Sequence, residues 1–169
     1  MELIDKLTDE QIRDIAETID AMDNICYINR ETGEVIFMMN DEMLSDYGIS
    51  WEDEDEEDVP PDDDSPDWQK DMYSEVKADM EKIYSWDFED TIRIKKPESH
   101  ESFEFMERFV DEIIPEGKLK QDFWKALSRS HPFRNFNAIV HNCKYREDWF
   151  RFKQVAMEEY VRKEIGRYE

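Results

Sequence analysis

Apolar residues recur at helical spacing through most of the chain. In "LTDEQIRDIAETIDAMD", residues 7–23, they stand three or four positions apart, and Thr8 and Gln11 have the spacing of a capping box. The same apolar spacing returns in five later segments. The pattern therefore predicts six amphipathic helices, at residues 7–23, 67–86, 99–114, 118–130, 132–142 and 145–165. The residues predicted to face inward are Ile12, Ile15, Ile19, Met22, Met72, Val76, Met80, Ile83, Phe103, Met106, Val110, Ile113, Leu119, Phe123, Leu127, Phe133, Phe136, Val140, Tyr145, Trp149, Phe152, Ala156 and Tyr160.

A different pattern, typical of strands, occupies "ICYINRETGEVIFMM", residues 25–39. Two runs rich in β-branched and aromatic residues flank a turn near residues 31–33, which contains Gly33. This predicts a β-hairpin, and "DTIRIKK", residues 90–96, is a candidate third strand. At 169 residues the chain has the length of one domain with one core. We therefore expect a mainly helical α+β single domain with a short antiparallel sheet near the amino terminus.

Both patterns disappear between residues 40 and 67. The stretch "WEDEDEEDVPPDDDSPDW" places eleven acidic residues and two adjacent prolines between Trp51 and Trp68. Such a composition cannot bury enough apolar surface to offset the entropy lost on ordering. We therefore expect residues 40–67 to form a flexible acidic loop inserted within the domain, and the two tryptophans to dock its ends onto the fold.

Charge narrows the function classes further. The chain has a formal charge of −23, and sixteen acidic residues but no lysine or arginine lie between Arg30 and Lys70, which leaves only −7 for the rest. This field opposes direct binding to nucleic acid or to an anionic membrane. The chain also lacks an apolar run of about 20 residues and a basic, apolar signal sequence at "MELIDKLTDEQ", so we expect a cytoplasmic protein.

Three uses of the acidic run are open. A calcium loop of the EF-hand type would need a central glycine and a terminal glutamate, and it would lie between two helices. The acidic run does not have this pattern. A basic protein partner, including a DNA-binding protein for which the carboxylates mimic phosphates, is the leading specific use. A solvating loop that keeps the domain dispersed is the simplest use, and it is the one we favour for the run as a whole. The residues that a basic partner would contact are Glu52, Asp53, Glu54, Asp55, Glu56, Glu57, Asp58, Asp62, Asp63 and Asp64.

Residues that could carry chemistry are sparse. Cys26 and Cys143 stand alone, without a second thiol or a histidine at ligand spacing, so neither a disulfide nor a zinc site is expected. No catalytic residue, metal or cofactor is predicted. The most suggestive constellation is Arg134, Asn137 and His141, which share one face of the helix predicted from Pro132. A guanidinium near a helix amino terminus could hold a carboxylate or phosphate, whereas the simpler alternative is that Arg134 bridges to an acidic residue and fixes neighbouring helices.

Several short segments resemble a numbered bacterial family of uncharacterised proteins of unknown function. They are "ICYINRETGEVIF", "SHESFEFMERFV", "HPFRNF" and "DWFRF", which together cover roughly half of the chain. Most of the matching residues are aromatic or turn residues, so the resemblance concerns the fold and implies no particular reaction. The acidic run lies outside them. The matching residues are Thr32, Gly33, Glu34, Val35, Phe103, Met106, Phe109, Pro132, Phe133, Arg134, Phe136, Trp149 and Phe150.

The sequence as a whole favours a non-enzymatic protein-interaction domain whose acidic loop contacts a basic partner. The alternative is a protein that binds a small anion or a phosphate-containing ligand with the helix around Arg134. This alternative covers both simple binding proteins and enzymes. The oligomeric state has no signal in the sequence.

Overall fold

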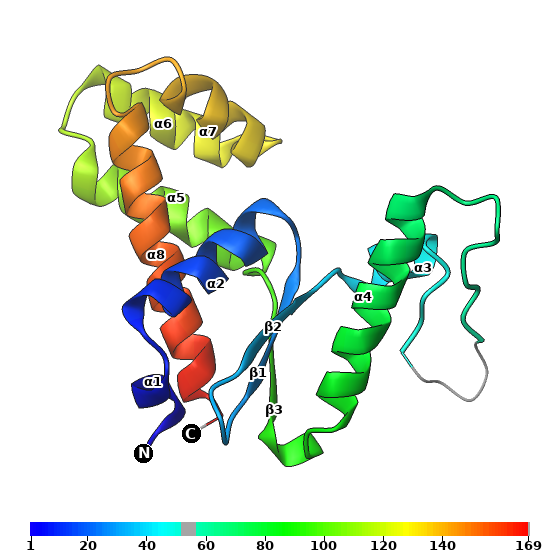
Figure 1. Cartoon of the computed structure of the whole chain (residues 1–169). Coiled ribbons are helices and arrows are strands. Elements are labelled where there is room, and N and C mark those ends of the chain that lie inside the picture. Colours follow the sequence, from blue (N-terminus) through cyan, green and yellow to red (C-terminus); the bar gives the residue numbers. More distant parts are fainter. Residues whose placement is uncertain (52–56, 169) are drawn as a thin grey trace. The chain divides into compact units, whose positions relative to one another are not determined.

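The computed structural model describes residues 1–51 and 57–168, and it divides the chain into two compact units (Figure 1). The sheet unit contains Met1–Lys96 and Val161–Glu169, and the helical unit contains Pro97–Tyr160. The elements of the sheet unit are α1 (Leu3–Lys6), α2 (Asp9–Ala21), β1 (Ile25–Asn29), β2 (Val35–Met38), α3 (Asp41–Asp46), α4 (Asp67–Tyr84), the 3-10 turn η1 (Phe88–Asp90) and β3 (Thr91–Ile94). Those of the helical unit are α5 (Ser99–Ile113), α6 (Lys118–Ser128), α7 (Pro132–Val140) and most of α8 (Arg146–Gly166).

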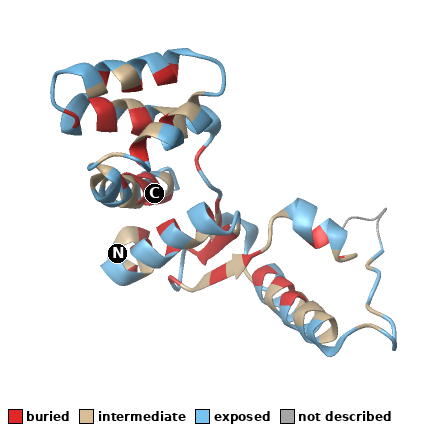
Figure 2. Cartoon of the chain, turned by 90° about the horizontal axis from the view of Figure 1, so that it is seen from above, coloured by how far each residue is buried: buried red, intermediate tan, exposed pale blue. Residues whose placement is uncertain are grey.

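The three strands form an antiparallel sheet in the order β2-β1-β3. Ile25 pairs with Met38 on one side of β1, and Cys26 pairs with Ile94 on the other side. All five residues of β1 are buried. Figures 1 and 2 show the reason, because α2 covers one side of the sheet and α4 lies on the opposite side.

The hairpin turn between β1 and β2 is closed by side-chain and backbone hydrogen bonds. The buried Asn29 accepts hydrogen bonds at its side-chain oxygen from the backbone N–H groups of Glu31 and Thr32, each 2.9 Å long. Gly33 donates its N–H to the Asn29 carbonyl at 2.8 Å and has a positive φ of 76°. A glycine is favoured there because a Cβ strains this left-handed conformation.

The core between the sheet and α4 is largely aliphatic. Met80 and Ile83 from α4 pack there with Leu44 from α3 and with Ile49, which follows α3. The strands contribute every second residue, as expected for a pleated sheet. These strand residues are Ile25, Tyr27, Ile36 and Met38.

The helical unit is built around aromatic rings. Phe109 lies at the centre, with ring centroids 5.1 Å from Trp149, 5.5 Å from Phe152, 6.2 Å from Phe136 and 6.5 Å from Phe123. All four pairs are edge-to-face, an arrangement that ring quadrupoles favour. Four helices thus contribute rings to one interlocked cluster.

The sequence predicted most of these elements. The predicted α+β class, with helices in the majority and a short antiparallel sheet near the amino terminus, is confirmed, as are the Thr8–Gln11 capping box and the third strand. Three residues predicted to face inward are exposed instead, namely Met22 (64%), Phe133 (39%) and Ile113 (38%). Met22 and Ile113 lie at the carboxyl ends of their helices, where a periodic pattern no longer decides burial.

The prediction of a loop over residues 40–67 is wrong in its first part. Asp41–Asp46 forms α3, whose N-cap Asn40 accepts a hydrogen bond from the Met43 N–H at 2.9 Å. Leu44 and Ile49 are each 1% exposed, so this segment contributes to the core. Two apolar anchors and a capped helix were enough to order an acidic segment. Residues 52–56 lie outside the described residues, and the single-domain count stays a prediction.

Candidate functional site

The amino-terminal end of the acidic run is docked on the sheet unit through Trp51. Its ring lies 5.3 Å from the Tyr27 ring and 5.5 Å from the Tyr84 ring. Its indole N–H donates to Asp41 Oδ1 at 3.2 Å. The predicted docking of this end is confirmed. Trp68 differs, because it is 59% exposed, and the one ring contact that it makes within the described residues is an edge contact with Tyr47 at 6.4 Å.

Hydrogen bonds join the chain on the two sides of residues 52–56, and we call this closure the neck. The Val59 N–H donates to the Gly48 carbonyl at 2.7 Å, and the Ser50 N–H donates to Asp58 Oδ1 at 2.9 Å. Lys77 on α4 forms an ion pair with the same Asp58 carboxylate. Asp58 therefore fixes the segment to α4.

The environment of this ion pair shifts both pKa values. Burial acts to raise the pKa of Asp58, but the hydrogen bonds from Lys77 and from the Ser50 backbone outweigh it, so the pKa lies below its usual range. The hydrogen bond to Asp58 raises the pKa of Lys77 despite the opposing effect of burial. Both shifts favour the charged forms.

The remaining described acids of the run are more open. Asp62 accepts hydrogen bonds from the Ser65 hydroxyl and the Asp64 N–H, and Lys70 donates to the Asp63 carbonyl at 2.9 Å. The carboxylates of residues 62–64 and of Glu57 are exposed. Of the ten acids predicted to meet a basic partner, Asp58 serves the neck, and Glu52, Asp53, Glu54, Asp55 and Glu56 lie outside the described residues.

Beside Trp51 the sheet unit has an open hollow of about 490 Å³, which we call the aromatic hollow. Strand β1, the end of α4, the turn η1 and strand β3 contribute to its walls. Five of its lining residues are aromatic, and two carry opposite charges. The lining residues are Tyr27, Asp41, Trp51, Ile83, Tyr84, Trp86, Phe88, Thr91 and Arg93.

The polar groups of the aromatic hollow form one network. Arg93 donates to the Tyr27 hydroxyl oxygen through Nε at 3.1 Å and forms an ion pair with Asp41 at 3.0 Å. Asp41 in turn accepts the Trp51 indole N–H. Burial raises the pKa of Tyr27 above its usual value, and the nearby Arg93 acts against this rise. The tyrosine therefore stays protonated at neutral pH.

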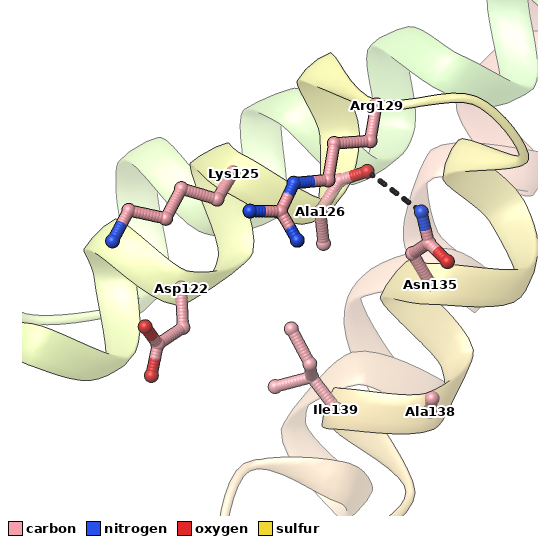
Figure 3. A pocket seen from close by; sticks show the side chains of 7 residues that line it. All are labelled: Asp122, Lys125, Ala126, Arg129, Asn135, Ala138 and Ile139. Atoms are coloured by element: carbon pink, nitrogen blue, oxygen red, sulfur yellow. Dashed lines mark hydrogen bonds between the residues drawn. The ribbon is translucent and has the colours of Figure 1, made fainter.

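The helical unit has a second open hollow, of about 550 Å³, between α6 and α7 (Figure 3). We call it the basic hollow, because Lys125 and Arg129 line it. Neither of these two cations forms an ion pair with an acidic residue in the described part of the chain. Asn135 donates to the Ala126 carbonyl at 3.4 Å and to the Ser130 carbonyl at 2.9 Å, which ties the two helices together. Asp122 supplies the only carboxylate among its lining residues.

The predicted anion-binding residues lie on another face of α7. Arg134, Asn137 and His141 are exposed, and none of the three lines the basic hollow. Within the described residues no acidic side chain forms an ion pair with Arg134, so nothing described fixes it to a neighbouring helix. The His141 ring lies 5.9 Å from the Phe150 ring. The structure thus leaves the three side chains at the surface.

Two signals for the hollows were present in the sequence and were missed. The segment "YSWDF", residues 84–88, places three aromatic residues within five positions where α4 ends. Lys125 lies in the last turn of α6 and Arg129 is the C-cap residue of that helix, so the two cations stand at the same end of α6. The Asp41–Arg93 pair had no such signal, because 52 positions separate its members.

No group of three or more His, Cys, Asp or Glu side chains in residues 1–51 and 57–168 is arranged to hold a metal ion. None of the described helices combines the length and the apolar character needed to cross a membrane. Comparisons with protein-family models, with curated proteins and with solved structures find no match to this chain. The resemblance to a bacterial family of uncharacterised proteins therefore stays a prediction.

Proposed function

We propose that the protein is a non-enzymatic, cytoplasmic interaction protein that contacts a basic protein partner through its sheet unit. The observation that carries this proposal is the uneven distribution of charge. The helical unit has twelve acidic and ten basic residues, so its formal charge is −2 and the sheet unit carries −21 of the total of −23. A field of one sign on one part of a molecule attracts and orients an oppositely charged partner during association.

The described ends of the acidic run support this proposal. Trp51 and Asp58 attach the described ends of this part of the run to the sheet unit, and Trp51 also lines the aromatic hollow. The free thiols of Cys26 and Cys143 suit the reducing cytoplasm that the proposal assumes.

The test is a charge-neutralised variant in which the acids at residues 52–57 become Asn or Gln, with Asp58 kept to preserve the neck. We expect basic proteins captured from a cytoplasmic extract at about 0.05 M salt to be lost with this variant, and to be lost from the wild type at about 0.5 M salt. A matched control neutralises six exposed acids of the helical unit. These are Glu104, Asp111, Glu112, Glu116, Glu147 and Glu159.

The control should retain the captured proteins, because it removes the same charge from the other unit. Equal capture by the neutralised variant and the wild type would contradict the proposal. Circular dichroism of both variants checks that each variant retains the fold of the wild type.

A second candidate function is the binding of a small anion or a phosphate-containing ligand by the helical unit. The observation in its favour is that Lys125 and Arg129 line a hollow without an ion pair to any described acid. A bound anion would raise the melting temperature, because ligands that bind only the folded state stabilise it. Arg129→Ala should remove the shift produced by phosphate or sulfate, and Arg134→Ala should remove it only if the anion binds the exposed face of α7.

A further inference from the structure

The aromatic hollow presents more aromatic surface than the core of the sheet unit uses. Phe88 is 93% exposed and Tyr84 is 44% exposed, and both line the hollow with the half-buried Trp86. Single exposed apolar residues are common on proteins, but several rings gathered around one hollow are typical of a contact surface. The hollow is therefore suited to a ligand that benefits from aromatic faces.

Asp41 brings a carboxylate to the same surface. Its side chain is 58% exposed, and it accepts one hydrogen bond at each oxygen, from the Trp51 indole and from Arg93. A carboxylate has about four acceptor positions. Asp41 can therefore accept further hydrogen bonds from a ligand while it keeps both existing partners.

Arg93 does not make this hollow an anion site. The Arg93 guanidinium donates hydrogen bonds to Asp41 and to the Tyr27 hydroxyl. The guanidinium carbon Cζ lies 5.9 Å from the centre of the Tyr27 ring. The charges of Arg93 and Asp41 cancel within the lining. Further acids adjoin the lining residues along the chain, and the whole unit carries −21. These adjoining acids are Glu42, Asp87, Glu89 and Asp90.

We propose that the aromatic hollow binds an arginine side chain of the basic partner, with the guanidinium against the aromatic rings and hydrogen-bonded to Asp41. The inference rests on the proposed function, to which it adds a specific contact. Arginine fits the hollow better than lysine does, because its planar guanidinium stacks on rings and presents several N–H donors in a fixed geometry. Phe88, at the exposed margin, contacts the apolar residue next to that arginine.

The probe is the peptide acetyl-Gly-Leu-Arg-Leu-Gly-amide, titrated into the full chain by calorimetry and by NMR of the indole N–H signals. The matched peptide carries citrulline, which has the shape of arginine but no charge. We expect the citrulline peptide to bind about tenfold more weakly, a difference within the range that cation–π contacts provide. The signals of Trp51 and Trp86 should shift, whereas those of Trp124 and Trp149 in the helical unit should not.

Two variants test the assigned residues. Asp41→Asn should weaken the arginine peptide about fivefold, the loss of one charge-assisted hydrogen bond, while Asp46→Asn, the same change at an exposed position of α3, should not. Phe88→Ala removes a ring that is 93% exposed, so it should leave the fold intact and weaken binding about threefold. Phe150→Ala, at a 40% exposed ring of the helical unit, is its control.

Each of the following results would overturn the assignment. They are equal binding of the two peptides, indole shifts confined to the helical unit, binding of phosphate at Arg93, and a dimer that Phe88→Ala dissociates. Tight binding of tetramethylammonium alone would assign the hollow to small organic cations and overturn its assignment to a partner side chain.

If the hollow variants capture the basic partner normally and the neutralised variant does not, this inference fails while the proposed function stands. If the peptide binds but neutralising residues 52–57 leaves capture unchanged, the proposed function fails on its own.

Discussion

The helical unit carries a formal charge of −2 around a cluster of interlocked aromatic rings, whereas the sheet unit carries −21 around a largely aliphatic core. In the helical unit, rings from all four helices meet at Phe109, so aromatic packing dominates its core, and the Asn135 hydrogen bonds between α6 and α7 add to it. In the sheet unit, the neck and the Trp51 contacts attach a strongly acidic segment to that core. Concentrated charge is therefore compatible with a small core when specific polar contacts hold the charged segment.

The largest effect is expected from Phe109→Ala in the helical unit. Phe109 is 0% exposed and contacts four other rings, so its truncation should lower the free energy of unfolding by about 3–5 kcal/mol. Urea unfolding followed by circular dichroism measures this loss. Phe150→Ala, at a 40% exposed ring, should lower the free energy by less than about 1 kcal/mol. Equal losses of stability in the two variants would mean that the aromatic cluster is not what stabilises the helical unit.

Gly48→Ala tests the neck of the sheet unit. Gly48 has a φ of 73°, and a Cβ built there would lie 2.7 Å from the Val59 carbonyl oxygen. We expect a loss of about 2 kcal/mol in the free energy of unfolding, because the strained backbone and the steric contact both act against the native neck. Gly166→Ala is the control, since a Cβ there meets no atom within 4 Å and alanine suits a helix better. If Gly48→Ala left the free energy of unfolding unchanged, the neck would not stabilise this unit.

Removing the Asp58 charge should have a smaller, pH-dependent effect. Asp58→Asn keeps a hydrogen-bond acceptor for Ser50 but loses the ion pair with Lys77. The side chain of Asp58 is 20% exposed and that of Lys77 is 30% exposed, so we expect the free energy of unfolding to fall by about 1 kcal/mol at pH 7. The pKa of Asp58 is lowered on folding, so its contribution is present above its unfolded pKa of 3.8 and disappears as the pH falls through the lower folded value. The pKa of Lys77 is raised, so its contribution is present below 10.5 and disappears as the pH rises through the folded value.

Urea unfolding of the wild type and Asp58→Asn between acidic and alkaline pH checks both directions. The two proteins should converge at the acidic end, where Asp58 is protonated, and at the alkaline end, where Lys77 is neutral. Asp63→Asn is the control, because only the backbone carbonyl of Asp63 accepts a hydrogen bond from Lys70. A constant difference across the whole range would mean that packing, and not the ion pair, explains the loss.

The smallest effect is expected from Arg134→Ala on α7. Arg134 is exposed and forms no ion pair with a described acid, so the free energy of unfolding should change by less than about 0.5 kcal/mol. Thermal unfolding of the variant beside the wild type measures this change. A loss well above 1 kcal/mol would mean that Arg134 fixes neighbouring helices, and the helical unit would then depend on polar contacts as the sheet unit does.

The sequence predicted the elements whose signals are local. The apolar spacing, the Thr8–Gln11 capping box and the turn at Gly33 each act within a few residues, and each is present in the structure. Helix α3 was missed because its acidic composition outweighed two apolar anchors, Leu44 and Ile49, which stand five positions apart and give no clear period. Composition predicts disorder on average, and two well-buried side chains override the average.

The complete aromatic hollow could not be assembled from local patterns, for a different reason. The aromatic hollow combines residues from three distant stretches, and the pairing of β1 with β3 is what brings Arg93 beside Tyr27. The register of two strands that are far apart in sequence cannot be worked out from their apolar alternation alone. Arg134 was chosen because its segment suggested a helix start. The helix is present, but it lines the neighbouring hollow with Asn135, Ala138 and Ile139 and not with Arg134, and the two cations of that hollow precede α7 in the chain.

The neck has a consequence for how this protein can change. Because Gly48 is bonded to Val59 and Ser50 to Asp58, the chain is already closed on both sides of residues 52–56. Doubling the length of a closed loop costs only about 0.6 kcal/mol of closure entropy. Insertions or deletions between Trp51 and Glu57 can therefore alter the number of carboxylates while the sheet keeps its register. Evolution, or an engineer adding a peptide tag, can set the charge of this unit at one position almost independently of its fold.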